Sequence, residues 1–371
     1  MEILSDGSRS PAGDAWELSY RSAGYGVTRY AASRVHQNVE SESVNVRARV
    51  TVGGRLGMAT TSDLRPEGVR AVLRKAYQIA RTCPEGTEAP VFPGPSEDRA
   101  KSDNLFSRGT DECTAADRAE RVNVILKRLG GDSLEAAGLV STRTDRAAVL
   151  NSMGLSDAYR STTGCIRVFA LGKNHALGSG RRASGYAGGV HRDFEALDPA
   201  AIASTAARKA VRGRDPTPIE PGSYDVILEP AAVSEVLEWM AMGSFGARSL
   251  EDGSSFLAGR IGEKVTGDAI SIRTTDASVP MGAPAEAFDT EGVRRQATPL
   301  IEKGVAVGVV HDSRTAGRAS ASADEEIRST GHASDDGLSS GPSVKHLEML
   351  PGTASFSELV SKVERGLWVT R

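Results

Sequence analysis

Apolar and polar side chains alternate most regularly in residues 44–52, which read VNVRARVTV. The apolar positions fall on one side of an extended chain, and the polar positions between them fall on the other. This period of two predicts a β-strand with one buried face and one face in water. Gly53 and Gly54 come next and predict a two-residue hairpin turn into a strand at 55–61, because both turn positions require a positive φ.

Similar but shorter patterns occur on both sides of this hairpin. Apolar residues at a spacing of three and four predict helices at 66–80, 115–129 and 202–212, with Asp63 as the expected cap of the first helix. Further strands are predicted at 15–21, 26–31, 35–39, 137–143, 146–151, 155–161 and 164–171. The fold class is therefore α+β, with a curled antiparallel N-terminal sheet that packs against helices.

The second half of the chain is organised around residues 223–265. A short apolar strand at 226–228 precedes Pro230, which suits the first turn of a helix, and an apolar stripe continues that helix as far as Gly243. A loop rich in glycine and serine follows. Later strands are predicted at 269–273, 298–302 and 305–310, and residues 317–343 are too polar to predict anything but a loop. The C-terminal domain should thus be rich in antiparallel β-strands.

Composition shifts divide the chain into four parts. We expect an N-terminal α/β sheet domain at 1–85, a linker rich in proline, glycine and charge at 86–108, and a central domain of helices and hairpins at 109–217. Prolines at 216, 218 and 221 mark the boundary to a C-terminal domain at 218–371.

Three stretches of this sequence resemble the TldD/PmbA family. The first is VTRYAASRVHQNVESESVNVRARVTVGGRLGMATTSDL, the second is YDVILEP followed by GSSFLAGRIGEKV, and the third is TPLIEKGVAVGVVHDSRTA. The resemblance extends over residues 15–371, with its most specific motifs in the first and last thirds. The loop that carries the family motif contains Gly253, Ser254, Ser255, Phe256, Gly259, Gly262 and Glu263.

The helix that follows the YDVILEP strand decides which type of family member the chain resembles. TldD-type members carry HExxxH on this helix, with two zinc-binding histidines and a glutamate that activates the zinc-bound water. This chain has Glu238, Trp239 and Gly243 in that segment and no histidine. It therefore resembles the metal-free TldE/PmbA type, and we expect neither catalytic residues nor a metal in this chain.

The resemblance also implies partners. TldD-type and TldE-type chains form a heterodimeric metallopeptidase that cleaves unfolded peptides in a chamber, and an older label for the family is modulator of DNA gyrase. We therefore expect a TldD-like subunit that bears HExxxH and zinc, and an unfolded peptide substrate. Trp239 and Met242 fall off the apolar stripe of their helix and are candidates for the subunit contact. His311 and Asp312, at the end of the shared hairpin, are candidates for lining the chamber.

Composition narrows the function further. The net charge of −3 does not indicate a nucleic-acid or membrane surface of one sign. Three cysteines without CxxC spacing are typical of reduced thiols in the cytoplasm, and no leader-like or membrane-spanning apolar run is present. The six histidines include no HExxH pattern, so only a metal site assembled from distant residues stays open.

Several alternatives remain at this point. The chain could be a hydrolase of different chemistry that uses His311 or His191, or a decayed or split family member that only binds peptides or a partner. The loop at 252–255 could cradle an anion through its N–H groups or could simply be tightly packed. Family members continue past the GLWVTR strand, so we expect the C-terminal domain to be truncated at its end. The identity of the peptide substrate cannot be predicted from these residues.

Overall fold

A computed structural model describes residues 14–84, 91–95, 102–172, 182–214, 217–277, 285–334 and 341–371. The first 13 residues and most of the expected linker lie outside the described residues. The larger sheet has six antiparallel strands in the order β3-β2-β1-β4-β5-β6. Its strands are β1 Ala15–Ala31, β2 Arg34–Val52, β3 Arg55–Thr61, β4 Leu134–Asn151, β5 Ser156–Gly172 and β6 Ser184–His191. Because β1 pairs with β4, the expected N-terminal and central parts share this one sheet.

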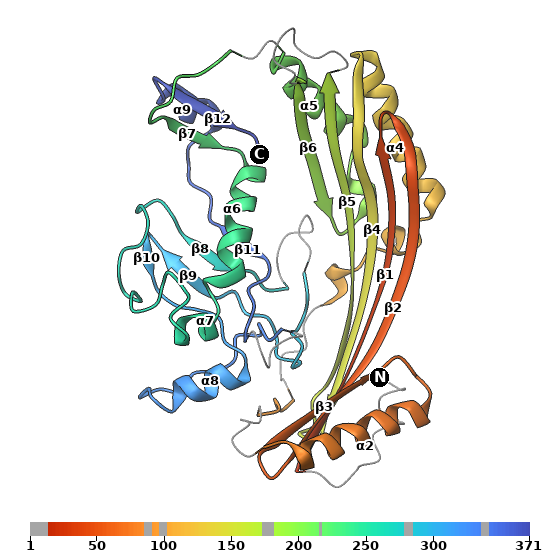
Figure 1. Ribbon diagram of the computed structural model, residues 1–371, viewed down its shortest axis with the longest axis vertical. Helices are drawn as coiled ribbons and strands as arrows, with labels where there is room; N and C mark the ends of the chain where they lie inside the picture. The colour runs from red at the N-terminus through yellow and green to blue at the C-terminus, as the bar shows by residue number, and fades with distance from the viewer. Residues whose placement is uncertain are drawn as a thin grey trace.

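The long curved strands of this sheet differ from the prediction of many short ones (Figure 1). The two strands predicted at 15–21 and 26–31 are halves of β1, and those predicted at 35–39 and 44–52 are halves of β2. Polar residues at 40–43 interrupt the side-chain pattern, yet their backbone pairs with residues 23–26 of β1. Side-chain periodicity does not report this pairing, since a strand can be exposed on both faces and still be held by its backbone hydrogen bonds.

One face of the sheet is apolar and is covered by helices at both ends. At one end, α2 (Pro66–Thr82) packs Val69, Val72 and Leu73 onto Val46 and Val50 of β2. At the other end, α4 (Ala115–Gly131) and α5 (Pro199–Arg212) enclose a second core with β4 and β5. The short helices η1 (Ser102–Leu105), α3 (Arg108–Asp111) and η2 (Phe194–Ala196) connect these elements. The helices thus leave the middle of this face open.

Details of the first hairpin and helix test two local predictions. Gly53 and Gly54 have φ values of 55° and 73°, so the predicted turn is confirmed. The prediction for Asp63 is wrong, because the N-cap position of α2 is Arg65, without a side-chain cap. Asp63 instead accepts a hydrogen bond from the backbone N–H of Arg65 at 3.0 Å, which forms a turn just before the helix.

The polar face of the strand at 44–52 was predicted to be in water, and this prediction is wrong at Arg49 and Thr51. Arg49 and Thr51 are each only 7% exposed. Arg49 donates to Glu17 from Nη2 at 2.8 Å and to Glu291 from Nη1 at 3.1 Å. Glu291 belongs to the C-terminal part of the chain, which lies against the concave side of the sheet (Figure 1). A polar strand face is therefore buried by charge pairing with another region.

That C-terminal part contains two small sheets. One is antiparallel, in the order β10-β9-β8-β11, and the other pairs β12 with β7 in parallel. Its strands are β7 Asp225–Leu228, β8 Ile272–Thr274, β9 Pro299–Glu302, β10 Val305–Ala306, β11 Leu347–Met349 and β12 Gly366–Val369. Its helices are α6 Pro230–Gly243, α7 Ala247–Glu251, α8 Ser313–Ser320 and α9 Phe356–Ser361, so the loop predicted at 317–343 begins inside a helix. The α+β architecture is confirmed.

Candidate functional site

The loop that follows α7 is held by its own backbone. The N–H of Gly253 donates to the carbonyl of Leu250 at 3.2 Å, and the N–H groups of Ser254 and Ser255 both donate to the carbonyl of Ser249 at 3.0 Å. Gly253 has a φ of 70°, the left-handed conformation that often ends a helix. These three N–H groups already have acceptors, so they do not form a cradle for an anion.

Side chains fasten the same loop to the C-terminal core. The Ser255 hydroxyl donates to the carbonyl of Ser244 at 2.6 Å and accepts from the N–H of Leu257 at 3.0 Å. Leu257 is fully buried, and the Phe256 ring meets the Phe245 ring edge-on at 6.1 Å. These contacts support the interpretation of a tightly packed loop.

The second half of the motif joins this loop to β10. The N–H of Gly262 donates to the carbonyl of Ala306 at 2.8 Å, and the N–H of Ala306 donates to the carbonyl of Glu263 at 2.9 Å. Gly259 and Gly262 have φ values of 71° and 87°, which side chains other than glycine rarely adopt. The motif therefore fixes the course of the chain between α7 and the antiparallel sheet.

Helix α6 presents a different kind of surface. Leu237 packs into the C-terminal core, whereas the side chains of Trp239 and Met242 are 74% and 73% exposed. Glu238 and Gly243 are exposed as well. A tryptophan and a methionine are thus in water on a helix that provides no imidazole.

His311 and Asp312 lie at the start of α8 and have separate roles. Asp312 is buried and caps the helix, accepting from the N–H of Thr315 at 2.7 Å. Burial lowers the pKa of His311, although the neighbouring Asp312 opposes the shift. The hydroxyl of Ser313 donates to Glu291 at 3.0 Å. The Asp312–Thr315 capping box and the Ser313–Glu291 bond are those of a structural turn.

His191 also has a structural setting. Its Nδ1 lies 2.8 Å from the carbonyl oxygen of Asp193 and 3.0 Å from the N–H of the same residue. Within the described ranges, no group of three or more histidine, cysteine, aspartate or glutamate side chains is arranged to hold a metal ion. The described residues thus give no support to a hydrolase built on His311 or His191.

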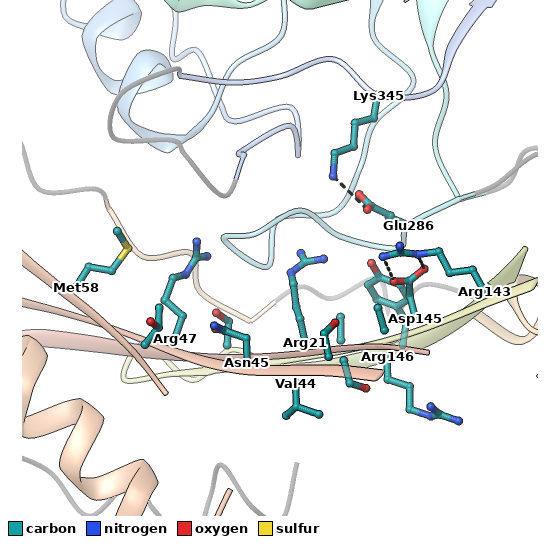
Figure 2. Close-up of a pocket in the computed structure, with 17 residues that line it drawn as sticks. Arg21, Val44, Asn45, Arg47, Met58, Arg143, Asp145, Arg146, Glu286 and Lys345 are labelled. Atoms are coloured by element: carbon teal, nitrogen blue, oxygen red, sulfur yellow. Dashed lines mark hydrogen bonds and ion pairs between the residues drawn. The ribbon is translucent and has the colours of Figure 1, made fainter. Parts of the chain in front are cut away.

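A cavity of about 560 Å³ lies between the concave face of the sheet and the C-terminal part. We call it the sheet cavity. Arg21, Asn45 and Arg47 point into it from β1 and β2, and Glu286 and Lys345 reach it from the other side (Figure 2). The other residues that line it are Ser19, Ser22, Ala23, Ser43, Val44, Met58, Thr60, Arg143, Asp145, Arg146, Ala147 and Tyr159. The volume is in the range of pockets that hold small ligands.

Charge pairs fix the side chains at one end of the sheet cavity. Arg143 forms two hydrogen bonds of 2.6 Å to the carboxylate of Asp145, and Lys345 donates to Glu286 at 3.3 Å (Figure 2). Burial alone would raise the pKa of Glu286, but Arg295, Lys345 and Arg21 lower it to about 2. Glu286 is therefore ionised at neutral pH, with three cations around it.

Sequence reasoning missed the sheet cavity, although part of its signal was present. Arg47 belongs to the polar face of the strand at 44–52, which was expected to be in water. Arg21, Arg143 and Lys345 come from segments far apart in the chain. Arg21 and Arg143 are brought together only by the pairing of β1 with β4. No local motif marks such a site.

A second cavity, of about 510 Å³, lies over the uncovered middle of the helix-bearing face. Arg118 of α4 is buried there and donates to Glu40 at 2.8 Å. Gly26 allows this approach, because a Cβ at that position would come within 2.3 Å of the guanidinium.

The three cysteines are unpaired thiols. No described helix is long and apolar enough to span a membrane.

Comparison with known proteins identifies the family of this chain. Residues 221–371 match the model described as PmbA/TldA metallopeptidase C-terminal domain, and residues 16–80 match PmbA/TldA metallopeptidase domain 1. The chain belongs to the TldD/PmbA family. A metalloprotease from Methanothermobacter thermautotrophicus is 25% identical over 338 residues, which are 87% of this chain and 69% of that protein.

Solved structures share the fold of this TldD/PmbA family member. TldE from Thermococcus kodakarensis superposes with a TM-score of 0.86 at 20% identity, over 100% of this chain and 81% of that one. A protein from Thermotoga maritima, described as a proposed modulator of a DNA gyrase, superposes with a TM-score of 0.83 at 21% identity, over 96% of this chain and 78% of that one. At these identities the likeness shows the fold alone.

Proposed function

We propose that this chain is the non-catalytic, TldE/PmbA-like subunit of a TldD/TldE-type metallopeptidase complex that degrades unfolded peptides in the cytoplasm. In this proposal a TldD-like partner carries HExxxH and the zinc ion, and this chain completes the assembly without supplying a metal ligand. The names of its relatives support the general activity, since they are metalloproteases and a TldE.

The surface of α6 carries the proposal. The resemblance places HExxxH on this helix in TldD-type chains, with the carboxylate and imidazoles that zinc chemistry requires. Here the helix exposes Trp239 and Met242 instead. Tryptophan is among the residues that most often dominate the binding energy of an interface, and methionine adapts its shape to a partner.

Elements near the start of α6 also expose apolar side chains. The strands β7 and β12 and the helix α9 lie together there (Figure 1). Their exposed large apolar side chains are Val226, Leu228, Phe356, Leu359, Val360 and Trp368. A concentration of this kind on a folded chain is typical of a protein–protein contact surface. It supports a subunit interface that includes α6.

The test is reconstitution with an HExxxH homologue. We expect a heteromeric complex on size-exclusion chromatography, chelator-sensitive cleavage of an unfolded peptide by the complex, and no cleavage by this chain alone. Elemental analysis of this chain should find far less than one zinc ion per molecule. The Trp239→Ala/Met242→Ala variant should bind the homologue at least about tenfold more weakly, as hot-spot losses usually do.

A matched control separates the anchor from general apolarity. Met153 is 54% exposed on the turn between β4 and β5, far from α6, so Met153→Ala should leave binding unchanged. Wild-type affinity in the Trp239→Ala/Met242→Ala variant contradicts the anchor assignment. One chelatable zinc ion per chain, or peptidase activity of the isolated chain, contradicts the non-catalytic role.

The sheet cavity favours one of the alternatives as a second candidate. A cavity of this size, lined by charged and polar groups, suits a family member that binds a peptide without a catalytic partner. Peptide binding by the isolated chain, with no complex formed by any HExxxH homologue, distinguishes this candidate from the subunit.

A further inference from the structure

We propose that the sheet cavity binds a peptide segment that carries an acidic side chain, with Arg143 and Lys345 as the groups that recognise the carboxylate. The proposal does not require a catalytic partner, so it stands whether or not the subunit assignment holds.

The sheet cavity carries a net positive charge. Arg21, Arg47 and Arg143 reach it from the sheet and Lys345 reaches it from the C-terminal part, against the two carboxylates of Asp145 and Glu286. Arg146 also lines it, but its side chain points away through the other face of the sheet (Figure 2). The space is therefore cationic by two charges, in a chain whose net charge is −3.

Arg143 and Lys345 keep N–H donors that a ligand can use. Arg143 uses two of its five N–H groups on Asp145, and Lys345 uses one of its three on Glu286. Both side chains are partly exposed, at 49% and 41%. Each is thus held in position by an acidic neighbour and still has N–H groups for a second acceptor. A positioned guanidinium binds a carboxylate with good directional specificity.

The other groups that line the cavity favour a peptide over a phosphate as its ligand. Asp145 and Glu286 border the same space as the cations and repel a doubly charged phosphate more strongly than a singly charged carboxylate. The hydroxyl and amide groups of Ser19, Ser43 and Asn45 also line the cavity and are suited to backbone N–H and C=O groups. A singly charged side chain on a peptide backbone fits this mixture, because the backbone N–H groups can donate to the two carboxylates.

The experiment measures binding of short capped peptides to the full chain at low ionic strength by calorimetry. The probes are acetyl-Gly-Ser-Asp-Ser-Gly-amide, the same peptide with asparagine at its centre, and the asparagine peptide with a free C-terminal carboxylate. Inorganic phosphate and a short oligonucleotide are further probes. We expect the aspartate peptide to bind at least about tenfold more tightly than the capped asparagine peptide, as charge-assisted hydrogen bonds are about twice as strong as neutral ones.

Variants locate the site. Arg143→Gln and Lys345→Gln should each weaken binding of the aspartate peptide by about tenfold or more and leave the affinity for the asparagine peptide unchanged. Arg328 provides the matched control, because it pairs with a carboxylate two residues away, as Arg143 does, but lies on an exposed turn outside the cavity. Arg328→Gln should bind the aspartate peptide like the wild type, and all three variants should keep the wild-type circular dichroism and melting temperature.

The remaining outcomes overturn the proposal. Equal binding of the aspartate and capped asparagine peptides removes the acidic preference, and wild-type affinity in Arg143→Gln and Lys345→Gln moves the site elsewhere. Tighter binding of phosphate or of the oligonucleotide assigns the cavity to a different ligand. If only the peptide with the free C-terminus binds, the site recognises a chain terminus and not a side chain. Failure to reconstitute with an HExxxH homologue affects none of these readings, so it counts against the proposed function only.

Discussion

The two halves of the molecule achieve order in different ways. In the first, β1 and β2 run for 17 and 19 residues, and their continuous backbone ladder is covered by helices over two apolar cores. In the second, β10 has two residues and β12 has four, and large apolar side chains remain in water on α6, β7, α9 and β12. The comparison indicates a scaffold with two apolar cores of its own, joined to a region whose exposed apolar surface is available to other molecules.

Buried charge joins these two halves. Arg49 of β2 is bonded at once to Glu17 of β1 and to Glu291 of the C-terminal part. Burial raises the pKa of Glu17, although Arg49 opposes this shift. Taking these ions out of water is unfavourable unless every one is paired, so the network holds the C-terminal part in one position on the sheet.

The largest expected effect comes from breaking that network. Arg49→Met leaves two buried carboxylates without their cation and should lower the free energy of unfolding by about 3–5 kcal/mol, measured by urea denaturation. Arg65→Met removes an exposed pair with Asp63 and should not change the unfolding midpoint measurably. A normal midpoint in Arg49→Met shows that other contacts hold the two halves together.

Acid should weaken the C-terminal half first. Burial, aided by Arg295, lowers the pKa of His332 to about 3 and that of His346 to about 4. Both histidines stay neutral in the folded state while they gain protons in the unfolded state, so their contribution to stability is complete above pH 6.5 and is lost below it. Asp289 opposes this loss, because burial and the neighbouring Glu291 raise its pKa to about 7.

Two histidines outweigh one aspartate, so the net loss between pH 7 and pH 4.5 should be roughly 2 kcal/mol. Urea midpoints at these two pH values measure it. The His332→Leu variant should lose less stability than the wild type over the same interval. Equal midpoints at both pH values for the wild type contradict the neutral buried histidines.

A smaller effect tests the scaffold alone. Gly26→Ala places a Cβ against the buried guanidinium of Arg118 and should lower the unfolding free energy by about 1–3 kcal/mol, the usual loss from overpacking. Gly24→Ala lies two residues away on the same strand, with nothing within 4 Å of its Cβ, and serves as the control. Identical losses in both variants would point to glycine's backbone freedom and not to the arginine.

The smallest effect is expected on the exposed surface of α6. Trp239→Ser/Met242→Ser should change the unfolding free energy of the isolated chain by less than about 0.5 kcal/mol, as exposed substitutions usually do. Leu73→Ala, on the buried face of α2, should lower the unfolding free energy by about 2–5 kcal/mol. A large loss in the α6 variant means that its apolar side chains stabilise the chain itself, which removes the contrast between the two halves.

Local patterns predicted much of the scaffold. The alternation at 44–52, the glycine turn and the apolar stripe of α2 each report contacts within a few residues, and the structure has all three elements. The extent of β1 and β2 was not predictable in this way, because the exposed polar residues at 40–43 join the two halves of β2 through backbone pairing with β1. Periodicity detects buried side chains and not hydrogen-bonded backbone.

The candidate site was harder to predict, for a related reason. The absence of HExxxH on α6 and the exposure expected for Trp239 and Met242 follow from one helix, and the structure exposes both side chains. Arg143 and Lys345 become neighbours of one cavity only through sheet pairing and the packing of two regions. Arg49 shows the same limit, since an arginine on a polar strand face reads as solvated until another part of the chain covers it.

The parallel pairing of β7 with β12 has a consequence for synthesis on the ribosome. Asp225 finds its partner in Gly366, so β7 leaves the exit tunnel long before the strand that completes its sheet. The large sheet and the helices that form its two apolar cores are complete by Arg212 and can fold in the meantime, since domains generally form in the order of translation. During this interval the backbone N–H and C=O groups of β7 lack their partner strand, and an unpaired strand edge of this kind is prone to pair with another chain.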